Sequence, residues 1–299
     1  MIREITPEEI EDIRPIFNRI REKLSDIPEN FLDRIKESVS TDKASLYANY
    51  DDGGSVNGVA LFGKVSSRFS IIFADGNLEL EKDLASVLFD RFSKERDYIV
   101  TGGPWLSKSL ADHLISIGFT KYERAYMTLA RANIEALPNP EIPDGLWFET
   151  YLESSRKEVS NLVFTCNDGH VDQDVFPEFF GSREACKQLL ENIEANRYGD
   201  YKEGQSWLLF SEGANIGACF MTIRNGTAGY IPDICVNPEF RGKGLGKALL
   251  VHSMKHQLKV EGDLTQVDLD VTLSNNAKFL YKSLGFDTVR EYSMYTWKK

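Results

Sequence analysis

The chain has 299 residues, of which 42% are hydrophobic and 11% aromatic, and its formal net charge is −11. This length exceeds one typical domain, so we expect two domains, and the apolar content is ample for two buried cores. The acidic charge argues against broad nucleic-acid binding and favours a cationic substrate, although acidic surfaces usually serve only solubility. No apolar run is long enough to cross a membrane, and no basic leader followed by an apolar run stands at Met1, so we expect a cytoplasmic protein.

Residues 1–137 alternate between strands and helices. Thr6, Pro7 and Glu9 mark a helix start, because they place a capping residue, a proline at the first helical position and an acid three residues after the cap. Further helices are expected at 29–39, 78–94 and 108–117, and strands at 1–5, 45–50, 56–65, 70–74, 98–101 and 121–129. The segment 137–145, with three prolines, is expected to be an interdomain linker.

Residues 145–299 follow a similar order of elements. Strands are expected at 146–151, 206–211, 216–223, 228–236, 265–271 and 286–297. Helices are expected at 154–164, at 183–195 and at 274–284, and another is expected to run from the glycine-rich segment to about 260. Ser274 is the expected cap of the last helix. A polar stretch, 167–174, lies between the first two helices. Ile117-Gly118-Phe119 and Leu284-Gly285-Phe286 end the two halves alike, which suggests a tandem duplication.

The cysteines and histidines give no sign of a disulfide framework or a metal centre. The four cysteines, Cys166, Cys186, Cys219 and Cys235, form no C-x-x-C pair, so we expect reduced thiols. His252 and His256 stand four residues apart and could share a metal on one helix face. Because the sequence offers no third ligand beside them, we expect two solvated helix residues and no metal.

Residues 241–246, Arg-Gly-Lys-Gly-Leu-Gly, follow an apolar strand and open a helix. The first amides of a helix lack intrahelical partners and lie at the positive end of its dipole, so they can bind an anion. The three glycines would let a phosphate approach the backbone without meeting a Cβ, and the arginine and lysine add positive charge. The spacing differs from those of the P-loop and the Rossmann fingerprint. Taken alone, the segment could also be a mobile surface turn, as short glycine motifs often are.

A second motif lies at 274–286, which reads Ser-Asn-Asn-Ala-Lys-Phe-Leu-Tyr-Lys-Ser-Leu-Gly-Phe. Together with Arg-x-x-Gly-x-Gly at 241–246, it resembles the GNAT acetyltransferases, whose signature is Asn-x-x-Ala-x-x-Leu-Tyr-x-x-Leu-Gly-Phe. The resemblance covers about 145–299, and it reaches 1–135 only through element order and the shared Gly-Phe end. The tandem layout resembles mycothiol synthase and related two-domain GNATs. Ser274 stands at the family asparagine, so Asn275 or Asn276 becomes the candidate for its contact to CoA.

This resemblance implies an α/β fold class of two tandem GNAT-like domains, each a mixed, mostly antiparallel sheet flanked by helices. It implies a degenerate N-terminal domain at 1–137 and a catalytic domain binding acetyl-CoA at 145–299. The strand that ends at Val236 should splay from the strand at 265–271, and pantetheine should lie in the gap. The residues implied to bind acetyl-CoA are Ile234, Cys235, Val236, Arg241, Gly242, Lys243, Gly244, Leu245, Gly246, Lys247, Asn275 and Asn276.

Tyr281 and Asp233 are the candidate catalytic residues. A tyrosine, with an ordinary pKa of about 10, can protonate a departing thiolate, and the motif implies that Tyr281 lies near the sulfur. Asp233, on the strand ahead of the glycine loop, is the candidate base for the attacking amine. Structural roles stay open for both, as a core aromatic and as a strand-end hydrogen-bond acceptor. Cys235 could suggest an acyl-cysteine, but the resemblance implies direct transfer.

The sequence therefore predicts an N-acetyltransferase that moves the acetyl group of acetyl-CoA to a primary amine of a small molecule or peptide. The alternatives are a non-catalytic sensor of acyl-CoA and a protein-interaction scaffold. We expect no CoA binding in the first half, because Leu114 stands where the second half has Tyr281 and acids such as Asp75 and Glu79 surround a helix start. Neither the acceptor nor the oligomeric state follows from the sequence.

Overall fold

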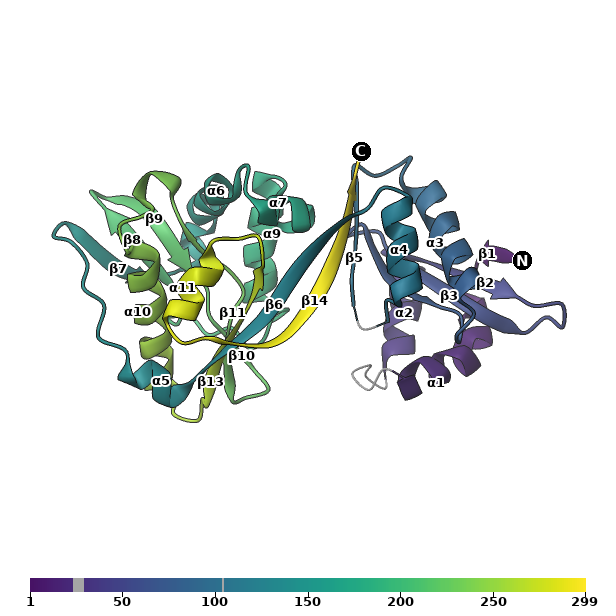
Figure 1. The fold of residues 1–299 in the computed structure, drawn as a ribbon, viewed down its shortest axis with the longest axis horizontal. Helices are drawn as coiled ribbons and strands as arrows, with labels where there is room; N and C mark the ends of the chain where they lie inside the picture. The colour runs from purple at the N-terminus through teal and green to yellow at the C-terminus, as the bar shows by residue number, and fades with distance from the viewer. Residues whose placement is uncertain (24–29, 104) are drawn as a thin grey trace. The chain divides into compact units, whose positions relative to one another are not determined.

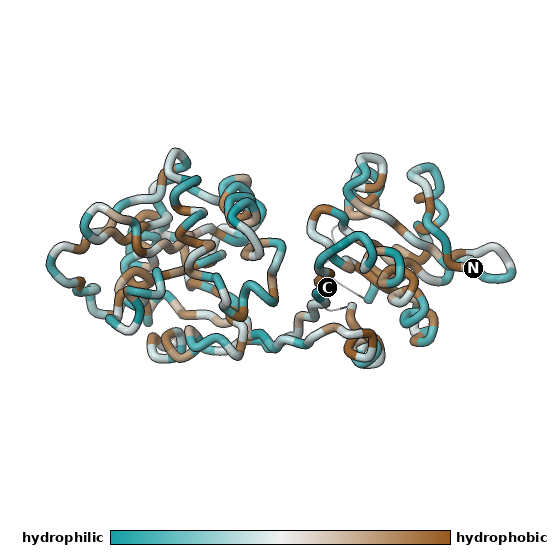
Figure 2. Tube along the Cα trace, turned by 90° about the horizontal axis from the view of Figure 1, so that it is seen from above, coloured by the Kyte–Doolittle hydropathy of each residue, from teal (hydrophilic) through white to brown (hydrophobic). Residues whose placement is uncertain are grey.

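The computed structural model describes residues 1–23, 30–103 and 105–299, and these fall into two compact units (Figure 1). Unit 1 contains Met1–Tyr122 and Ser293–Lys299, and unit 2 contains Glu123–Tyr292. In each unit the apolar residues concentrate in the interior, as the hydropathy colouring in Figure 2 shows. The units differ from the domains expected at 1–137 and 145–299, because each unit includes part of a strand from the other half of the chain.

Unit 1 is a sheet with helices on both faces. In sheet order its strands are β1 (Ile2–Glu4), β2 (Ala44–Tyr50), β3 (Val56–Gly63), β4 (Arg68–Phe73), β5 (Tyr98–Thr101) and the end of β14 (Asp287–Lys298). Its helices are η1 (Pro7–Ile13), α1 (Arg14–Lys23), α2 (Phe31–Ser40), α3 (Leu78–Phe92) and α4 (Lys108–Ser116). The first residue of the helix expected at 29–39 lies outside the described residues.

Along the strands of unit 1, neighbouring side chains point alternately to the two layers of helices. Leu46 and Leu61 belong to the core that they share with η1, α1 and α2, whereas Tyr47 and Phe62 belong to the core formed with α3 and α4. This follows from the two-residue period of a strand, which sends neighbouring side chains to opposite faces. All neighbouring strands pair antiparallel except β4 and β5, which are parallel.

Unit 2 has two groups of paired strands. One contains β6 (Thr120–Ala130), β13 (Gln266–Thr272), β11 (Ala228–Ile231) and β10 (Thr222–Arg224), and the other contains β12 (Ile234–Val236), β9 (Ala214–Cys219), β8 (Trp207–Ser211) and β7 (Leu146–Thr150). The helices are α5 (Arg131–Ala136), η2 (Glu153–Ser155), α6 (Arg156–Asn167), α7 (Val171–Val175), α8 (Pro177–Phe180), α9 (Arg183–Glu194), η3 (Pro238–Phe240), α10 (Leu245–Val260) and α11 (Ala277–Ser283). α10 and α11 share one apolar core with β13, whereas α6 and α9 share another with β8.

The strand expected at 228–236 is interrupted at Pro232 and Asp233. Up to Ile231 it is β11, which pairs in parallel with β13 and ends opposite Leu269. Beyond the interruption it is β12, which leaves β13 and pairs antiparallel with β9. The strand expected at 216–223 divides in the same way, into β9 and β10. The splayed strands implied by the resemblance to GNAT proteins are therefore present.

The last strand of each half supplies residues to both units. β6 pairs its segment Arg124–Ala130 with β13 in unit 2, and β14 pairs its segment Tyr295–Lys298 with β5 in unit 1. Gly118 and Gly285, which precede these two strands, both have positive φ, at 103° and 93°. The equivalence supports a duplication of the fold. Because most of β6 belongs to unit 2, the boundary between the units falls within β6, and the proline-rich segment at 137–145 lies inside unit 2.

Over the described part of the chain, no helix has both the length and the apolar character that a membrane crossing needs. Nor do the described His, Cys, Asp and Glu side chains gather in groups of three that could hold a metal ion. His252 and His256 are half-buried rather than solvated, because both rings pack edge-on against Trp207, with ring centroids 4.3 and 4.8 Å away.

Candidate active site

A cavity of about 870 Å³ lies in unit 2 where β12 separates from β13. Its walls come from the segment between β11 and β12, the glycine loop before α10, the start of α11 and the region from α6 to α8. All of the predicted site residues line this cavity except Lys243. The ammonium group of Lys243 instead lies over the ring of Phe240, 5.1 Å from its centroid.

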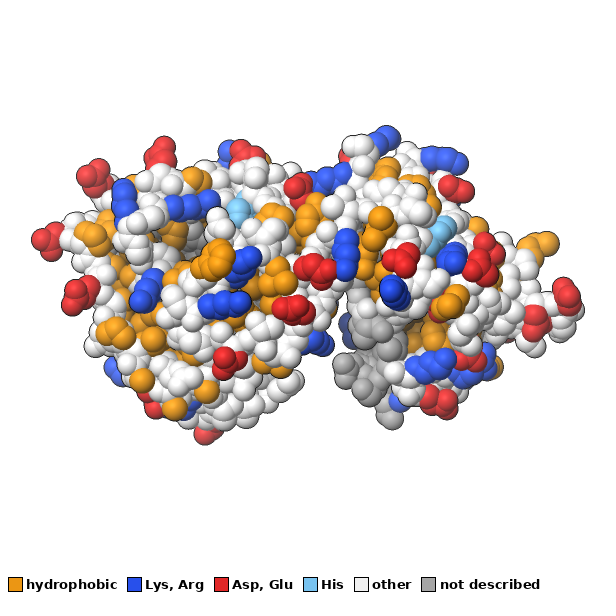
Figure 3. All heavy atoms as spheres, viewed as in Figure 1, with side chains coloured by type: hydrophobic (Ala, Val, Ile, Leu, Met, Phe, Trp, Pro, Cys, Tyr) orange, Lys and Arg blue, Asp and Glu red, His pale blue; other side chains and the backbone are white. Residues whose placement is uncertain are grey.

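The glycine loop leaves open space at the N-terminus of α10. Gly244 is the N-cap of this 16-residue helix and has φ of 77°, as does Gly242, a left-handed value that other residues adopt at a cost. A Cβ built at either glycine would meet no atom within 4 Å. The described residues thus leave room for an anion beside the free amides of the first turn. Lys and Arg side chains lie over α10 and α11 on the face of unit 2 drawn in Figure 3.

Arg241 holds the loop to the rest of the unit. Its Nε donates to the carbonyl of Val236 at 2.9 Å, and its Nη2 donates to the carbonyl of Cys166 at 2.7 Å. The side chain therefore connects the end of β12 with the end of α6. We expected Arg241 to supply positive charge and to help bind acetyl-CoA, and the structure shows that its side chain also braces the loop.

β12 is an edge strand whose outer side faces away from its partner, β9. The carbonyl of Asp233 accepts from the amide of Phe220, and the amide of Asn237 donates to the carbonyl of Ile216. In an antiparallel ladder the paired residues alternate, so Ile234 turns its amide and carbonyl to the open side. The backbone of Ile234 can therefore accept a further extended chain in the gap.

Tyr281 lies on α11 and lines the cavity, with only 7% of its surface exposed. Its ring packs against Phe286, with the ring centroids 5.8 Å apart, so Tyr281 is a core residue that also lines the cavity. Burial raises the pKa of Tyr281, and the charges of Asp172 and Asp233 add to the effect. The hydroxyl therefore stays protonated at every working pH, as a proton donor must.

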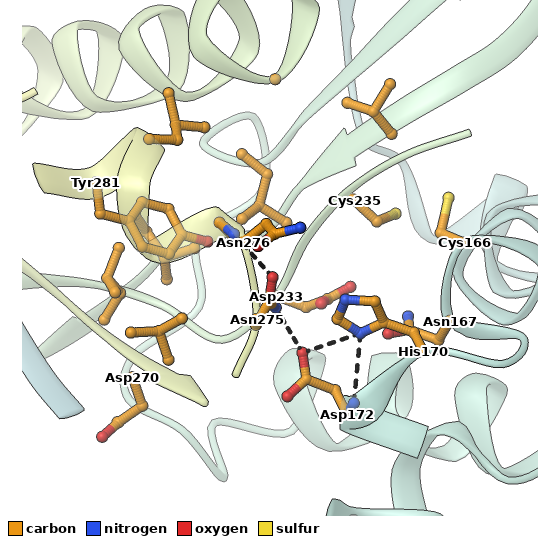
Figure 4. A pocket seen from close by; sticks show the side chains of 18 of the residues that line it. Cys166, Asn167, His170, Asp172, Asp233, Cys235, Asp270, Asn275, Asn276 and Tyr281 are labelled. Atoms are coloured by element: carbon orange, nitrogen blue, oxygen red, sulfur yellow. Dashed lines mark hydrogen bonds and ion pairs between the residues drawn. The ribbon is translucent and has the colours of Figure 1, made fainter. Parts of the chain in front are cut away.

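Asp233 lies at the interruption between β11 and β12. Its Oδ2 is buried and has no hydrogen-bond partner among the described residues. Burial, and after it the charge of Asp172, raise the pKa of Asp233 to about 7. A carboxyl group with this pKa exchanges protons near neutrality, which suits a general base. In Figure 4 its side chain points toward the ring of His170.

His170 and Asp172, on the polar stretch before and within α7, also line the cavity and were not predicted. Asp172 accepts from Thr272 at 2.6 Å and from Asn275 at 2.9 Å, and its Oδ2 lies 3.3 Å from Nδ1 of His170. Burial opposes ionisation of Asp172, but its bonds to His170 and Thr272 and the charge of Arg124 outweigh it, so its pKa is lowered. This ionised carboxylate ties α7 to β13 and to the start of α11 (Figure 4).

Asn275 and Asn276 both line the cavity, at the start of α11. The side-chain amide of Asn275 is already used, because its Nδ2 donates to Asp172 and its Oδ1 accepts the amide of Ala277 at 2.8 Å. The helix begins at Ala277 with Asn276 as N-cap, so the cap expected at Ser274 is wrong. The hydrogen bond from the amide of Ala277 to Oδ1 of Asn275 takes the place of the expected Ser274 cap.

Cys235 meets the side chain of Cys166 at the edge of the cavity (Figure 4). The contact with Cys166, and then burial, raise the pKa of Cys235 well above its usual value. Because the thiolate is the nucleophile, a thiol held in this state is a poor acyl carrier.

Comparison with known proteins relates the second half of the chain to acetyltransferases. Residues 202–288 match the Acetyltransferase (GNAT) domain family. A mycothiol acetyltransferase of Thermobispora bispora is 29% identical over 171 residues, which are 54% of this chain and 54% of that protein. The match thus spans about half the length of this curated relative.

Solved structures resemble the whole chain. A GCN5-related N-acetyltransferase from Sphaerobacter thermophilus is 16% identical and aligns over 100% of this chain and 95% of its own, with a TM-score of 0.60. A tandem GNAT protein from the clavulanic acid biosynthesis pathway is 14% identical and aligns over 100% of this chain and 98% of its own, with a TM-score of 0.61. At these identities the likeness shows the fold, two GNAT-like halves in tandem.

Proposed function

Because the second half of this chain contains a GNAT acetyltransferase domain, we propose that it is an acetyl-CoA-dependent N-acetyltransferase whose chemistry takes place in the unit 2 cavity. The observation that carries the proposal is the meeting of four features in that cavity. They are the open glycine loop, the free edge of β12, the protonated hydroxyl of Tyr281 and the carboxyl group of Asp233.

The residues present fit the acyl donor. The amides at the start of α10, with Gly242 and Gly244 leaving open space beside them, suit the pyrophosphate. The outward-facing backbone of Ile234 suits an amide of pantetheine, with its carbonyl as the acceptor, since its amide also interacts with the carboxyl group of Asp233. When bound, acetyl-CoA supplies the activated thioester carbonyl, and the chain supplies the groups around it.

Asp233 and Tyr281 divide the proton transfers. The ionised carboxylate of Asp233 takes a proton from the acceptor ammonium group, which leaves the free amine that attacks. After the amine attacks the thioester carbon, the nitrogen loses its second proton to solvent and the carbon–sulfur bond breaks. The hydroxyl of Tyr281 gives its proton to the leaving sulfur and regains one from solvent. His170 and Asp172 keep this side of the cavity polar, and Asp172 fixes the start of α11, the helix that carries Tyr281.

A thiol-release assay tests the proposal. The whole chain is incubated with acetyl-CoA and a panel of primary amines, and free CoA is measured against a control without amine. We expect amine-dependent release and an acetylated product by mass spectrometry. Acetyl-CoA binding by calorimetry without release for any amine would instead identify a sensor, and no binding at all would leave only a scaffold.

A further inference from the structure

We propose that Asp270 binds a second ammonium group of the acceptor, so that the substrate is a small diamine of which one nitrogen is acetylated. This inference rests on the proposed function, because it assigns the acceptor side of the same cavity. Figure 4 places Asp270 on the side of the cavity away from Cys166.

Asp270 stands where the two parallel strands part. Leu269 is the last residue of β13 paired with β11, so Asp270 is the first beyond the pairing. Leu269 and Val271 belong to the apolar core, and the period of a strand sends Asp270 to the opposite face. On the other side of the gap, Asp233 lies between β11 and β12, two residues beyond Ile231, the last paired residue of β11. Asp233 and Asp270 therefore both line the cavity close to the point where the two strands separate.

Two tyrosines hold Asp270 without neutralising it. The hydroxyl of Tyr292 donates to Oδ1 at 2.8 Å, and that of Tyr230 donates to Oδ2 at 3.0 Å. Burial, opposed by Arg124 and aided by the charge of Asp270, raises the pKa of Tyr292 to about 12, so this donor stays neutral. A carboxylate offers about four acceptor sites, so about two remain for a ligand.

The two arginines of this part of the cavity contact the tyrosines that hold Asp270, and neither forms an ion pair with Asp270 itself. Arg124 donates to Thr272 at 3.0 Å and to the Tyr292 hydroxyl at 3.1 Å, and its guanidinium lies over the ring of Phe176. Arg224 donates to the carbonyl of Tyr198 at 3.0 Å, and its guanidinium lies over the ring of Tyr230. Asp270 has no ion pair with any described residue. Its charge is therefore available to a cationic group that enters the cavity.

A matched set of acceptors tests this assignment. The whole chain is assayed for CoA release with 1,5-diaminopentane, pentylamine and 5-aminopentanoate, which share a five-carbon chain and differ in the far end. We expect kcat/KM to be about 10- to 100-fold higher for the diamine than for pentylamine, as one charge-assisted hydrogen bond gives, and lowest for the aminopentanoate. The difference should lie mainly in KM, because the far group does not react.

Two variants test whether Asp270 causes the preference for the diamine. Asp270→Asn keeps the shape of the side chain, and it should reduce the diamine kcat/KM by about 10- to 100-fold while changing that of pentylamine by less than about threefold. Asp268→Asn is the control, because it removes a charge from the same strand at a residue that does not line the cavity. It should leave the preference for the diamine unchanged. Thermal unfolding of both variants checks that they fold.

Wild-type enzyme that acetylates the diamine and pentylamine equally well would overturn the role of Asp270 and leave the proposed function intact. A diamine preference that persists in folded Asp270→Asn would do the same. If no amine releases CoA, the proposed function fails instead, and calorimetry with 1,5-diaminopentane then decides on Asp270. Binding that is weakened by Asp270→Asn supports the cation site, and unchanged or absent binding refutes it.

Discussion

Replacing Asp233 by asparagine should slow the reaction and stabilise the protein in the same pH range. The pKa of Asp233 is raised from 3.8 to about 7. The difference of about 3 units corresponds to about 4 kcal/mol of unfavourable interaction of the ionised form, as an upper bound, since one pKa unit is about 1.4 kcal/mol. The folded state binds the proton more tightly than the unfolded state, so stability is lost as pH rises from about 4 to about 7.

Asp233→Asn cannot ionise, so it avoids this loss. Thermal unfolding should give similar Tm values for the variant and the wild type at pH 4, and a higher Tm for the variant at pH 8. Activity should change in the opposite direction. The wild-type kcat/KM should rise with pH up to about 7, where half of the base is ionised, and level off above that pH.

Without the base, the variant depends on acceptor that is already deprotonated. For an amine with a pKa of about 10, that fraction is roughly 0.1% at pH 7 and about 10% at pH 9. The deficit of the variant should thus be about 10³-fold at pH 7 and about 10-fold at pH 9. A deficit that is the same at both pH values, or a Tm difference that does not change between pH 4 and pH 8, would refute the assignment of Asp233.

Three further outcomes follow from the same cavity. Gly244→Glu should abolish acetyl-CoA binding in calorimetry, because it places a carboxylate at the start of α10. The control variant Gly262→Glu changes another glycine with open space around it and should keep the binding. Unchanged affinity in folded Gly244→Glu would contradict the loop assignment. Tyr281→Phe should lower turnover by about 10²-fold with the same acetyl-CoA Kd, and full activity from pH 6 to 9 would remove Tyr281 from the mechanism. Titration should give one acetyl-CoA per chain, because the start of α3 in unit 1 is already capped: the side chain of Asn77 accepts the amide of Leu80 there. A second site that survives Gly244→Glu would show that unit 1 also binds acetyl-CoA.

The motifs predicted the fold class, but not how the strands are interrupted. The segments 241–246 and 274–286 carry local geometry, namely a helix start and a helix followed by a left-handed glycine, and both are found as expected. The break at Phe220 and Met221 was not predicted, because a continuous apolar run shows no sign of where a strand changes sheets. The sharing of β6 and β14 between the units depends on tertiary pairing, which a single sequence does not show.

The candidate site was predicted in part. Asp233 and Tyr281 line one cavity, as expected from motifs on neighbouring elements. Asp270 could have been found, because the alternation Val-Asp-Leu-Asp-Val places it on the face of β13 opposite the core. His170 and Asp172 could not, because they lie in a polar stretch without periodicity. The partners of Asp172 in the cavity, Thr272 and Asn275, lie about a hundred residues further along the chain.

The late arrival of β14 also affects how the chain is made and how it can evolve. In unit 1, Tyr295 is a buried core residue, and Trp297 packs against Phe89 with ring centroids 5.3 Å apart. A ribosome delivers this strand only after all of unit 2, so nascent unit 1 waits with one edge of β5 unpaired. Such an edge invites pairing with other chains, which makes this interval the one in which a chaperone would matter. For the same reason, a cut at the proline-rich segment would separate each half from a strand with which it pairs.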